Sequence, residues 1–360
     1  MDGFKNIEIK NFRGIDHLKI DDFSRVNVFL GQNSSGKSSV LEALLLLAGM
    51  SNPDLPLSLN KSRTRNFRIA YLQETRYQFY NLDLNNTPEF SSQQFDGVSR
   101  HLQVRLGYTD SEDDGIYSID EPLVFSDATR TPNTIEMLFD VTKDQKTKHF
   151  QSSLFVNQSD IPSRQEPAKE YVEKNYAVLF SSDLLSSNLG NDLSELFKRK
   201  QKDLLLKHLQ KFDARINAIE ILNNDVYIGF EDIKEMLPVS MSGDGLRRFL
   251  NIVAGSANPN NTMILIDEID NGLHYSAYKK LWEAIFALAT STNKQVFVTT
   301  HSKETLYYLN EMLQEAPDYK PDMRLYTLER TIKKGMQAYM YTYEGLSEAC
   351  NNDVELRSIV

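Results

Sequence analysis

The sequence predicts an α/β fold built around a parallel sheet, and two observations predict it. Val26–Leu30 is a short apolar run of strand-forming residues that ends at a polar loop and is followed by a helical stretch, Ser38–Ala48. Much later, the apolar runs Met263–Ile266 and Gln295–Thr299 flank a helix expected over residues 276–290. This strand–helix–strand order implies two parallel strands joined by a right-handed crossover.

The first thirty residues and the segment after the first predicted helix differ in composition and in hydrophobic pattern. Ile7 and Ile9 alternate with polar residues and predict a strand, so two strands and a turn are expected before the polar loop. Residues 51–160 are rich in Pro, Asn, Ser, Asp and Thr and contain short alternating runs such as His101–Tyr108. We therefore expect a β-rich insertion over 51–160.

Residues 161–224 are expected to form a helical lobe, because apolar residues recur there at helical spacing. This apolar stripe consists of Leu193, Leu196, Phe197, Leu204, Leu205, Leu209, Phe212, Ile216 and Ile219. Val226–Phe230 predicts a strand, and Arg324–Tyr343 predicts a hairpin that turns at Lys333–Gly335. The remaining divisions that we expect are a core formed by 1–50 and 225–345, and a C-terminal helix or tail at 346–360.

The composition is that of an ordinary soluble globular chain of 360 residues, with 41% hydrophobic and 25% charged residues. The single cysteine, Cys350, excludes an internal disulfide and fits a reducing compartment. The N-terminus lacks the apolar core of a signal peptide, and the longest apolar run, Val40–Met50, is too short to span a membrane. We expect a cytoplasmic protein without a membrane partner.

The net charge of −10 argues against a uniformly basic surface for nucleic acid, but it leaves a local basic patch open. Two short basic runs, Lys61–Arg68 and Lys198–Lys202, are candidates. The simpler interpretation of both runs is a solvated face of a loop or helix. Nucleic acid therefore stays open as a partner.

The run Gly31–Ser38 matches the phosphate-binding pattern G-x-x-x-x-G-K-[ST] in full, between a predicted strand and a predicted helix. Glycines allow backbone N–H groups to surround phosphate oxygens, and a helix N-terminus favours negative charge. We expect Lys37 to neutralise the β- and γ-phosphates and Ser38 to offer its hydroxyl to Mg²⁺. The residues expected to bind nucleotide here are Gly31, Asn33, Ser34, Ser35, Gly36, Lys37, Ser38 and Ser39.

Two carboxylates and a histidine follow the two later strands. Asp267 and Glu268 come directly after Met263–Ile266, at the end of a parallel strand where open α/β sheets bind ligands. We expect Asp267 to hold Mg²⁺, directly or through water, and Glu268 to polarise the attacking water. His301 follows Gln295–Thr299, and an imidazole there is expected to sense the γ-phosphate.

A second turn of small residues opens another helix. It consists of Ser242, Gly243, Asp244 and Gly245, and a turn of this kind forms an anion-binding helix N-terminus. It does not easily serve the same phosphates as the first loop. We expect it to cap the γ-phosphate bound to another subunit.

Together these motifs resemble the ABC-class ATPases of the RecF/SMC/OLD branch. The matching segments are NFRG at 11–14, GQNSSGKSS at 31–39, SGDGLRR at 242–248, ILIDEIDNGLH at 264–274 and TTHS at 299–302. The resemblance covers both ends of the chain, roughly residues 1–50 and 225–345. The residues between them match only in general character and contribute none of these motifs. It implies the α/β fold of an ABC-type ATPase head, with a mixed, mainly parallel core sheet, a β-rich insertion and a helical lobe, and it implies ATP and Mg²⁺ as cofactors.

The resemblance also implies roles for the residues that match the family's motifs. Lys37 and Ser38 correspond to the Walker A lysine and Mg²⁺ ligand, Asp267 and Glu268 to the Walker B pair, and His301 to the switch histidine. The Q-loop glutamine is left open among Gln73, Gln78 and Gln151.

Other matching residues are expected at a subunit interface or near the phosphates. Ser242–Gly243 corresponds to the signature motif acting in trans, and Asn271–His274 to the D-loop that crosses the dimer interface. Asp244–Gly245 replaces the Gly-Gln of the transporter signature, as is common in the OLD-like branch. Arg13 is expected to approach the phosphates, as in related heads.

The resemblance implies ATP hydrolysis to ADP and phosphate by a homodimer or a higher homo-oligomer with composite sites. OLD-family proteins add a Toprim nuclease, but the 59 residues after His301 are fewer than the roughly 100 that such a domain needs. The sequence is thus similar to stand-alone ATPases of prokaryotic anti-phage systems of the PARIS and Septu types. We expect a defence ATPase acting with a separately encoded effector protein, a nuclease or a toxin.

Three alternatives remain open. A RecF-like DNA-repair ATPase would clamp DNA across its dimer through a basic groove, with binding that depends steeply on salt. A non-hydrolysing interaction module would use ATP only to hold two copies together. A transporter subunit is the least favoured, because the head resembles the SMC branch.

Overall fold

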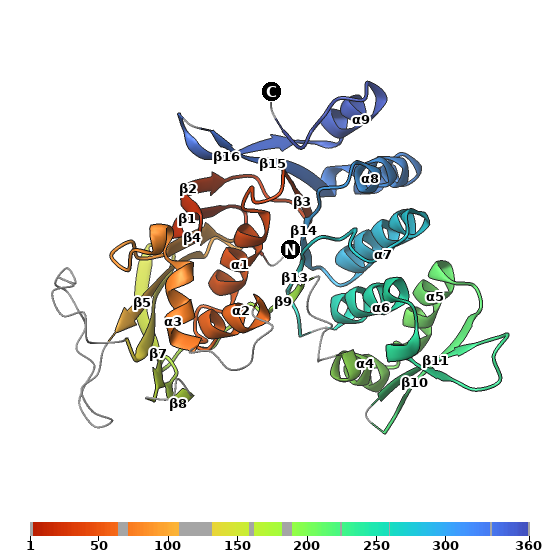
Figure 1. Ribbon diagram of the computed structural model, residues 1–360, viewed down its shortest axis with the longest axis horizontal. Coiled ribbons are helices and arrows are strands. Elements are labelled where there is room, and N and C mark those ends of the chain that lie inside the picture. Colours follow the sequence, from red (N-terminus) through yellow and green to blue (C-terminus); the bar gives the residue numbers. More distant parts are fainter. Residues whose placement is uncertain are drawn as a thin grey trace.

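The computed structural model describes residues 3–63, 71–107, 132–157, 162–181, 189–223, 225–258, 260–331 and 333–358. Within these ranges the chain forms a six-stranded mixed sheet, a seven-stranded antiparallel sheet and a small three-stranded sheet. Figure 1 shows the first helix between the two large sheets, with further helices on the opposite side of the six-stranded sheet. The expected fold class, α/β with a mixed and mainly parallel core sheet, is confirmed.

The six-stranded sheet positions the functional loops. Its order is β16 (Gly335–Tyr341), β15 (Met323–Thr331), β3 (Val26–Leu30), β14 (Gln295–Thr299), β13 (Met263–Ile266) and β9 (Ala177–Phe180). All neighbouring strands are parallel except the β15–β16 hairpin. The parallel pairing of β13 with β14 and the C-terminal hairpin were both predicted from the sequence. The edge strand β9 was not, because it lies in the segment predicted to be helical.

The central strands are buried on both faces, and their side chains alternate between two cores. From β14, Val296 and Val298 pack into one apolar cluster, while Phe297 packs into the other. From β13, Ile264 and Leu265 divide in the same way. This alternation follows from the two-residue period of a strand, and it explains why these runs are apolar throughout.

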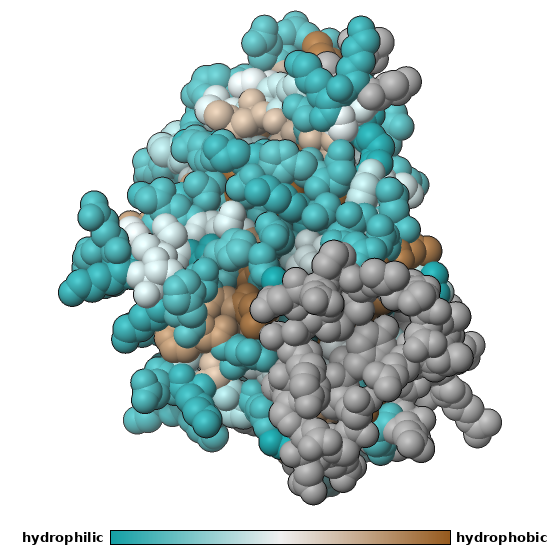
Figure 2. All heavy atoms as spheres, turned by 90° about the vertical axis from the view of Figure 1, so that its left-hand side faces the viewer, coloured by the Kyte–Doolittle hydropathy of each residue, from teal (hydrophilic) through white to brown (hydrophobic). Residues whose placement is uncertain are grey.

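The seven-stranded sheet joins the N-terminus to the insertion. Its order is β2 (Ile15–Ile20), β1 (Ile7–Phe12), β4 (Glu89–Gln93), β5 (Ser99–Gly107), β6 (Thr134–Lys143), β7 (Lys146–Val156) and β8 (Pro162–Glu166). The first thirty residues hold three strands rather than the expected two, and β1 and β2 belong to this sheet. The described surface on this side of the molecule is mainly hydrophilic, with apolar residues in separate patches (Figure 2).

Helix α1 (Lys37–Ala48) lies between the two large sheets. It faces apolar side chains on both sides, so most of its residues are buried. The chain then forms α2 (Leu55–Arg63), α3 (Tyr71–Thr75), η1 (Arg76–Gln78) and η2 (Tyr80–Leu82) before β4 begins. The described part of the segment 51–160 therefore opens with helices and continues in the strands β4 to β7.

The segment 161–224 contains α4 (Leu189–Lys198) and α5 (Lys202–Phe212), but it also contains β8, β9 and β10 (Ile216–Leu222). The prediction that Ile216 and Ile219 continue a helical stripe was wrong, because both lie in β10. A register shift between Ile216 and Ala218, typical of a β-bulge, separates these two buried residues. Their spacing of three therefore imitates a helix. Strand β10 pairs with β11 (Asp225–Phe230), and β11 pairs with β12 (Leu237–Pro238).

The remaining helices follow in chain order on the other face of the six-stranded sheet (Figure 1). They are η3 (Val239–Met241), α6 (Asp244–Ala257), η4 (Tyr275–Ala277), α7 (Tyr278–Ser291), α8 (Lys303–Glu315), η5 (Pro317–Asp322) and α9 (Tyr343–Asn351). No helix in the described part of the chain has both the length and the apolar character needed to cross a membrane.

Candidate nucleotide-binding site

Three loops meet at one edge of the six-stranded sheet, where β3, β14 and β13 end. These strands are parallel neighbours, so the residues after each strand lie together. Gly31 begins the loop after β3, Asp267 follows β13, and Thr300 follows β14. The structure therefore brings together the loop, the carboxylates and the histidine segment that the sequence analysis singled out.

The loop after β3 needs glycine at two positions. Gly31 and Gly36 have φ angles of 148° and 88°. A Cβ at Gly31 would lie 2.6 Å from the carbonyl oxygen of Leu328, and a Cβ at Gly36 would overlap the side chain of Met336. Both glycines thus have a backbone conformation that favours glycine, and at Gly31 the fixed backbone also leaves no space for a side chain.

The start of α1 presents polar groups suited to an anion. Gly36 caps the helix without a side-chain hydrogen bond, so α1 begins with backbone N–H groups facing the loop. Ser35 Oγ is buried and has no hydrogen-bond partner among the described residues. An unsatisfied buried hydroxyl is costly, and a phosphate oxygen at the loop would accept its hydrogen bond.

Lys37 is folded back into this loop. Its side chain is buried, and Nζ donates hydrogen bonds to the carbonyl oxygens of Gly31 at 2.9 Å and Gln32 at 2.8 Å. Burial lowers the pKa of Lys37, while the nearby carboxylates of Asp267 and Glu268 act in the opposite direction. The ammonium group is thus held where the loop would surround phosphates.

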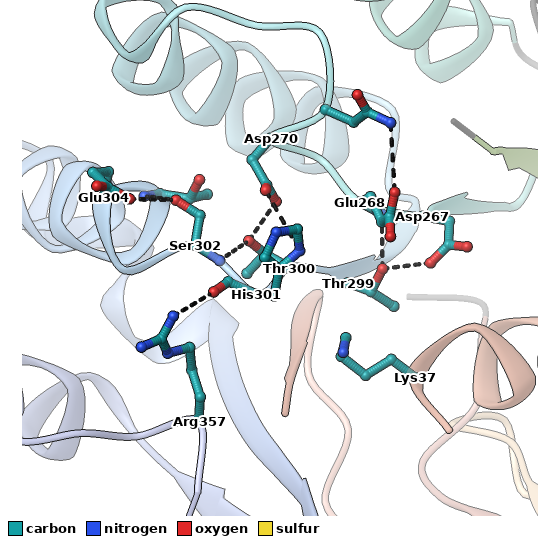
Figure 3. Close-up of polar contacts among 12 residues, drawn as sticks. Lys37, Asp267, Glu268, Asp270, Thr299, Thr300, His301, Ser302, Glu304 and Arg357 are labelled. Carbon is teal, nitrogen blue, oxygen red and sulfur yellow. Dashed lines mark hydrogen bonds and ion pairs between the residues drawn. The ribbon is translucent and has the colours of Figure 1, made fainter. Parts of the chain in front are cut away.

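Ser38 and Asp267 form the closest contact between the two halves of the site. Ser38 Oγ donates to Asp267 Oδ1 at 3.0 Å. Thr299 Oγ1 donates to the same oxygen at 2.5 Å (Figure 3). Thr299 Oγ1 in turn accepts from the backbone N–H of Glu268 at 2.8 Å. Hydroxyl and carboxylate oxygens suit Mg²⁺, which usually adds phosphate oxygens and water to one or two protein ligands.

A cavity of about 680 Å³ opens above the loop. Glu268 lines it, and its backbone has a left-handed φ of 50°, a conformation that costs free energy in a non-glycine residue and occurs often at functional sites. The other lining residues include Arg13, Asn33, Ser34, Ser35, Gly36, Lys37, Ser38, Ser39, Tyr77, Arg330 and Met336. All but one of the loop residues expected to bind nucleotide therefore line one cavity. The exception, Gly31, is buried behind Ser35.

Arg13 forms part of the cavity wall, and its guanidinium is paired with the carboxylate of Glu42 on α1. Its backbone also has a positive φ of 52°, and its N–H donates to the carbonyl oxygen of Gln78 at 2.8 Å. The side chain is close to the expected phosphate position, but it is already engaged by Glu42.

His301 is not among the residues that line the cavity, and its side chain is exposed. Its Nδ1 is 3.7 Å from Asp270 Oδ2, and the other oxygen of Asp270 accepts a hydrogen bond from Thr300 Oγ1 at 2.5 Å (Figure 3). The imidazole is therefore next to a carboxylate that is itself fixed by the preceding residue.

The turn formed by residues 242–245 lies elsewhere. It does not line the cavity, and it opens α6 at the surface, where the side chain of Asp244 is 75% exposed. Ser242 Oγ donates to the carbonyl oxygen of Val239 at 2.6 Å, and a Cβ at Gly243 would meet open space. The structure thus does not bring this turn to the phosphate loop of the same chain.

A family profile described as AAA ATPase domain matches residues 4–306 of the chain. The chain belongs to this family. It is 27% identical to a protein named ATP/GTP phosphatase from Helicobacter pylori. The alignment extends over 349 residues and covers 91% of this chain and 92% of that protein.

The chain is also similar to one further protein and to one solved structure. A DNA double-strand break repair Rad50 ATPase from Methanococcus maripaludis is 22% identical over 278 residues, which cover 74% of this chain and 26% of that protein. An SMC head domain from Thermotoga maritima superposes with a TM-score of 0.45 at 10% identity, covering 94% of this chain and 98% of that chain.

Arg248 is a site residue of this AAA ATPase domain that the sequence analysis did not single out. Its Nη2 donates to the carbonyl oxygens of Asp267 at 2.7 Å and Glu268 at 2.5 Å, so α6 is tied to the turn after β13. Its position at the end of the SGDGLRR segment was the available signal. Asp270 and Thr299 were also missed, although they adjoin the residues that were named.

The three candidates for a Q-loop glutamine remain unassigned. Gln78 is buried, and its side-chain amide donates to the carbonyl oxygen of Pro56 at 2.6 Å. Gln151 lies on β7 and donates to Ser153. The side chain of Gln73 lies outside the described residues.

The structure describes only one of the two basic runs, Lys198–Lys202, in full. Much of Lys61–Arg68 lies outside the described residues. In the second run, Lys198 and Lys202 form ion pairs with Glu195 and Glu220. These pairs favour the interpretation of this run as a solvated surface.

Proposed function

We propose that the chain binds ATP with Mg²⁺ and hydrolyses it to ADP and phosphate. The observation that supports this best is the contact of 3.0 Å between Ser38 Oγ and Asp267 Oδ1, with Lys37 and Glu268 beside it. Family membership as an AAA ATPase domain agrees with the use of ATP.

Each side chain has a chemical role in this proposal. Lys37 exchanges its carbonyl contacts for oxygens of the β- and γ-phosphates, and Ser38 and Asp267 would hold Mg²⁺. Bound there, Mg²⁺ supplies positive charge to the phosphate oxygens. Glu268 orients water for attack on the γ-phosphate and accepts its proton, while His301 donates a hydrogen bond near the γ-phosphate.

We propose that the site is completed by a second copy of the chain, with the turn at residues 242–245 capping the γ-phosphate in trans. The turn is exposed at the start of α6 and is not part of the cavity in its own chain. A helix N-terminus with open space at Gly243 suits an anion delivered by another subunit.

The first test replaces the proposed base. Glu268→Gln is expected to bind ATP normally but to lower turnover at least about 100-fold, because the amide cannot accept the proton. Steady-state phosphate release and binding of a fluorescent ATP analogue measure the two properties. Glu283→Gln, a partly exposed glutamate on α7, is the control and should match the wild type. Unchanged turnover in Glu268→Gln would exclude the assignment of this residue.

The second test mixes two inactive variants. Lys37→Ala removes the phosphate loop's cation, and Ser242→Arg blocks the exposed turn. A heterodimer of these two chains contains one composite site with both parts intact, so mixing should restore turnover. No restoration, or a Glu268→Gln protein that stays monomeric by light scattering with saturating ATP and Mg²⁺, would contradict a shared site.

We further propose that this ATPase is the sensor or regulator of a prokaryotic anti-phage system and acts on a separately encoded effector, a nuclease or toxin. The support is the resemblance of its combined motifs to stand-alone defence ATPases. The alternative is a RecF-like repair ATPase that clamps DNA across its dimer. It is favoured by the alignment of a repair ATPase with 74% of this chain.

Purification of the tagged protein from its native locus, with and without ATP, distinguishes the two. Co-purification of a nuclease-like or toxin-like neighbour, together with altered phage sensitivity in a deletion strain, supports the defence role. DNA that is retained by the protein alone and released steeply by salt supports the repair role.

A further inference from the structure

The segment after α9, residues 352–358, is packed against the body of the protein. Leu356 is buried in the main apolar cluster, and its carbonyl oxygen accepts a hydrogen bond from Thr327 Oγ1 on β15. The backbone N–H of Val354 donates to the carbonyl oxygen of Ala349 at 2.9 Å. These contacts fix the position of the residue that follows Leu356.

That residue, Arg357, contacts the loop between β14 and α8, residues 300–302, which carries His301 and is called the histidine loop below. Its Nη1 donates to the carbonyl oxygen of His301 at 2.9 Å (Figure 3). Its Nε and Nη2 donate to the two oxygens of Glu355 at 2.8 and 2.6 Å, and Glu355 also lies 3.4 Å from Lys303 Nζ. The guanidinium is planar, and its Nε and Nη2 are held by the carboxylate of Glu355. The direction of the hydrogen bond from Nη1 to the His301 carbonyl is therefore fixed.

The histidine loop is held on its other side by Asp270. This carboxylate lies 3.7 Å from the imidazole Nδ1 of His301 and accepts the hydroxyl hydrogen bond of Thr300. The backbone N–H of Ser302 donates to the same Thr300 hydroxyl at 3.1 Å. The peptide group that carries His301 therefore lies between Asp270 and Arg357, which come from widely separated parts of the chain.

We infer that Arg357 is a positioning residue for His301. The inference rests on the proposed function, in which His301 acts at the γ-phosphate. By binding the His301 carbonyl, Arg357 fixes the peptide plane and thus the direction in which the imidazole leaves the backbone. Arg357 does not line the cavity, so it acts on the orientation of His301 and not on the affinity for nucleotide.

The chain offers a matched control. Arg215 binds Asp213, two residues earlier, in the same bidentate manner, with Nε–Oδ1 and Nη2–Oδ2 distances of 3.1 and 2.8 Å. It directly precedes β10 and is not part of the cavity, and its Nη1 also donates to Asp232 Oδ2 at 3.2 Å. Substitution of Arg215 thus removes a bidentate ion pair of the same geometry, together with this additional contact, without touching the loop that carries His301.

The test compares steady-state ATP turnover of Arg357→Gln, Arg357→Lys and Arg215→Gln with that of the wild type. Arg357→Gln is expected to lower kcat at least about tenfold and to change KM for ATP less than twofold. Arg357→Lys should recover part of kcat, since an ammonium group still donates to the carbonyl. Arg215→Gln should match the wild type, and all three should unfold at similar temperatures.

A double variant tests whether Arg357 acts through His301. In a His301→Ala background, Arg357→Gln should lower kcat no further, because the residue that it positions is absent. An independent loss in that background, an unchanged kcat in Arg357→Gln, or an equal loss in Arg215→Gln would overturn the inference while leaving ATP hydrolysis established. A wild-type protein without ATP turnover would overturn both the proposed function and this inference.

Discussion

Lys37 and three carboxylates, those of Asp267, Glu268 and Asp270, are close enough to influence one another electrostatically. Burial disfavours the charged form of the lysine, and the carboxylates favour it. The backbone carbonyls of Gly31 and the following residue occupy its hydrogen bonds. A triphosphate with a bound divalent cation would bring anionic oxygens to the lysine and a cation to the carboxylates, so both signs of charge would be matched.

Lys37→Ala is predicted to lower the affinity for ATP by up to about 100-fold, because a charge-assisted contact of up to about 3 kcal/mol is lost. Isothermal titration with ATP and Mg²⁺ measures this directly. Lys146→Ala, at an exposed lysine that begins β7, should leave the affinity unchanged. An ATP affinity of Lys37→Ala equal to that of the wild type would refute the nucleotide site.

At the scale of elements, α6 joins two parts of the proposed mechanism. Its first turn begins in the exposed turn at residues 242–245, and Arg248 in its second turn binds the carbonyls of Asp267 and Glu268. At its other end, Lys294 Nζ donates to the carbonyl oxygens of Ser256 and Asn258. The helix is thus anchored at both ends to segments that border β13 and β14.

Lys294, which is buried against the C-terminal end of α6, predicts that the stability of the protein depends on pH. Burial lowers the pKa of Lys294 to about 8, below the value of about 10.4 for an unfolded lysine. Between these values the unfolded state binds more protons, so this residue makes the free energy of unfolding rise with pH, by up to about 3 kcal/mol. Below pH 8 both states are protonated and the contribution is constant.

Urea unfolding of the wild type and Lys294→Met between pH 7 and pH 10 measures this contribution. The wild type should gain stability relative to the variant as the pH rises through this window. Parallel curves for the two proteins would show that the lysine is protonated equally in both states.

The sequence predicted the elements whose signals are local. Gly31–Ser38 could be recognised because one function requires a fixed spacing of glycine, lysine and serine, and β13 and β14 because strands buried on both faces are apolar throughout. Strand β10 was misread because a bulge places Ile216 and Ile219 three residues apart. The contacts of Arg248 and Arg357 could not be predicted, since each binds a backbone carbonyl that is distant in the sequence and shows no pattern of its own.

At the scale of the whole molecule, Arg100 links the two large sheets through α1. The side chain is buried on β5, and its Nη2 donates to the carbonyl oxygens of Leu47 and Ala48 at the end of α1, each at 3.1 Å. It also binds both oxygens of Glu173 at 2.9 and 2.8 Å. A cation at a helix C-terminus is favourable, so one residue of the insertion supports the helix that begins at the phosphate loop.

Arg100→Met is predicted to lower the free energy of unfolding by about 3 kcal/mol, because the carboxylate of Glu173 loses its ion-pair partner and two helix carbonyls lose their donor. Chemical denaturation measures the loss. Adding Glu173→Gln to the variant should recover part of it, since the uncompensated charge is then removed. A loss below about 1 kcal/mol for Arg100→Met would contradict the proposed link.

The central place of β3 has a consequence for biosynthesis. This strand is made long before its two neighbours in the sheet, β14 and β15, and Asn27 and Val296 are 269 residues apart. Contacts between such distant residues form slowly. The proposed nucleotide site therefore forms only after β13 and β14 have been made, and a nascent chain that so far carries only the loop after β3 lacks the rest of it.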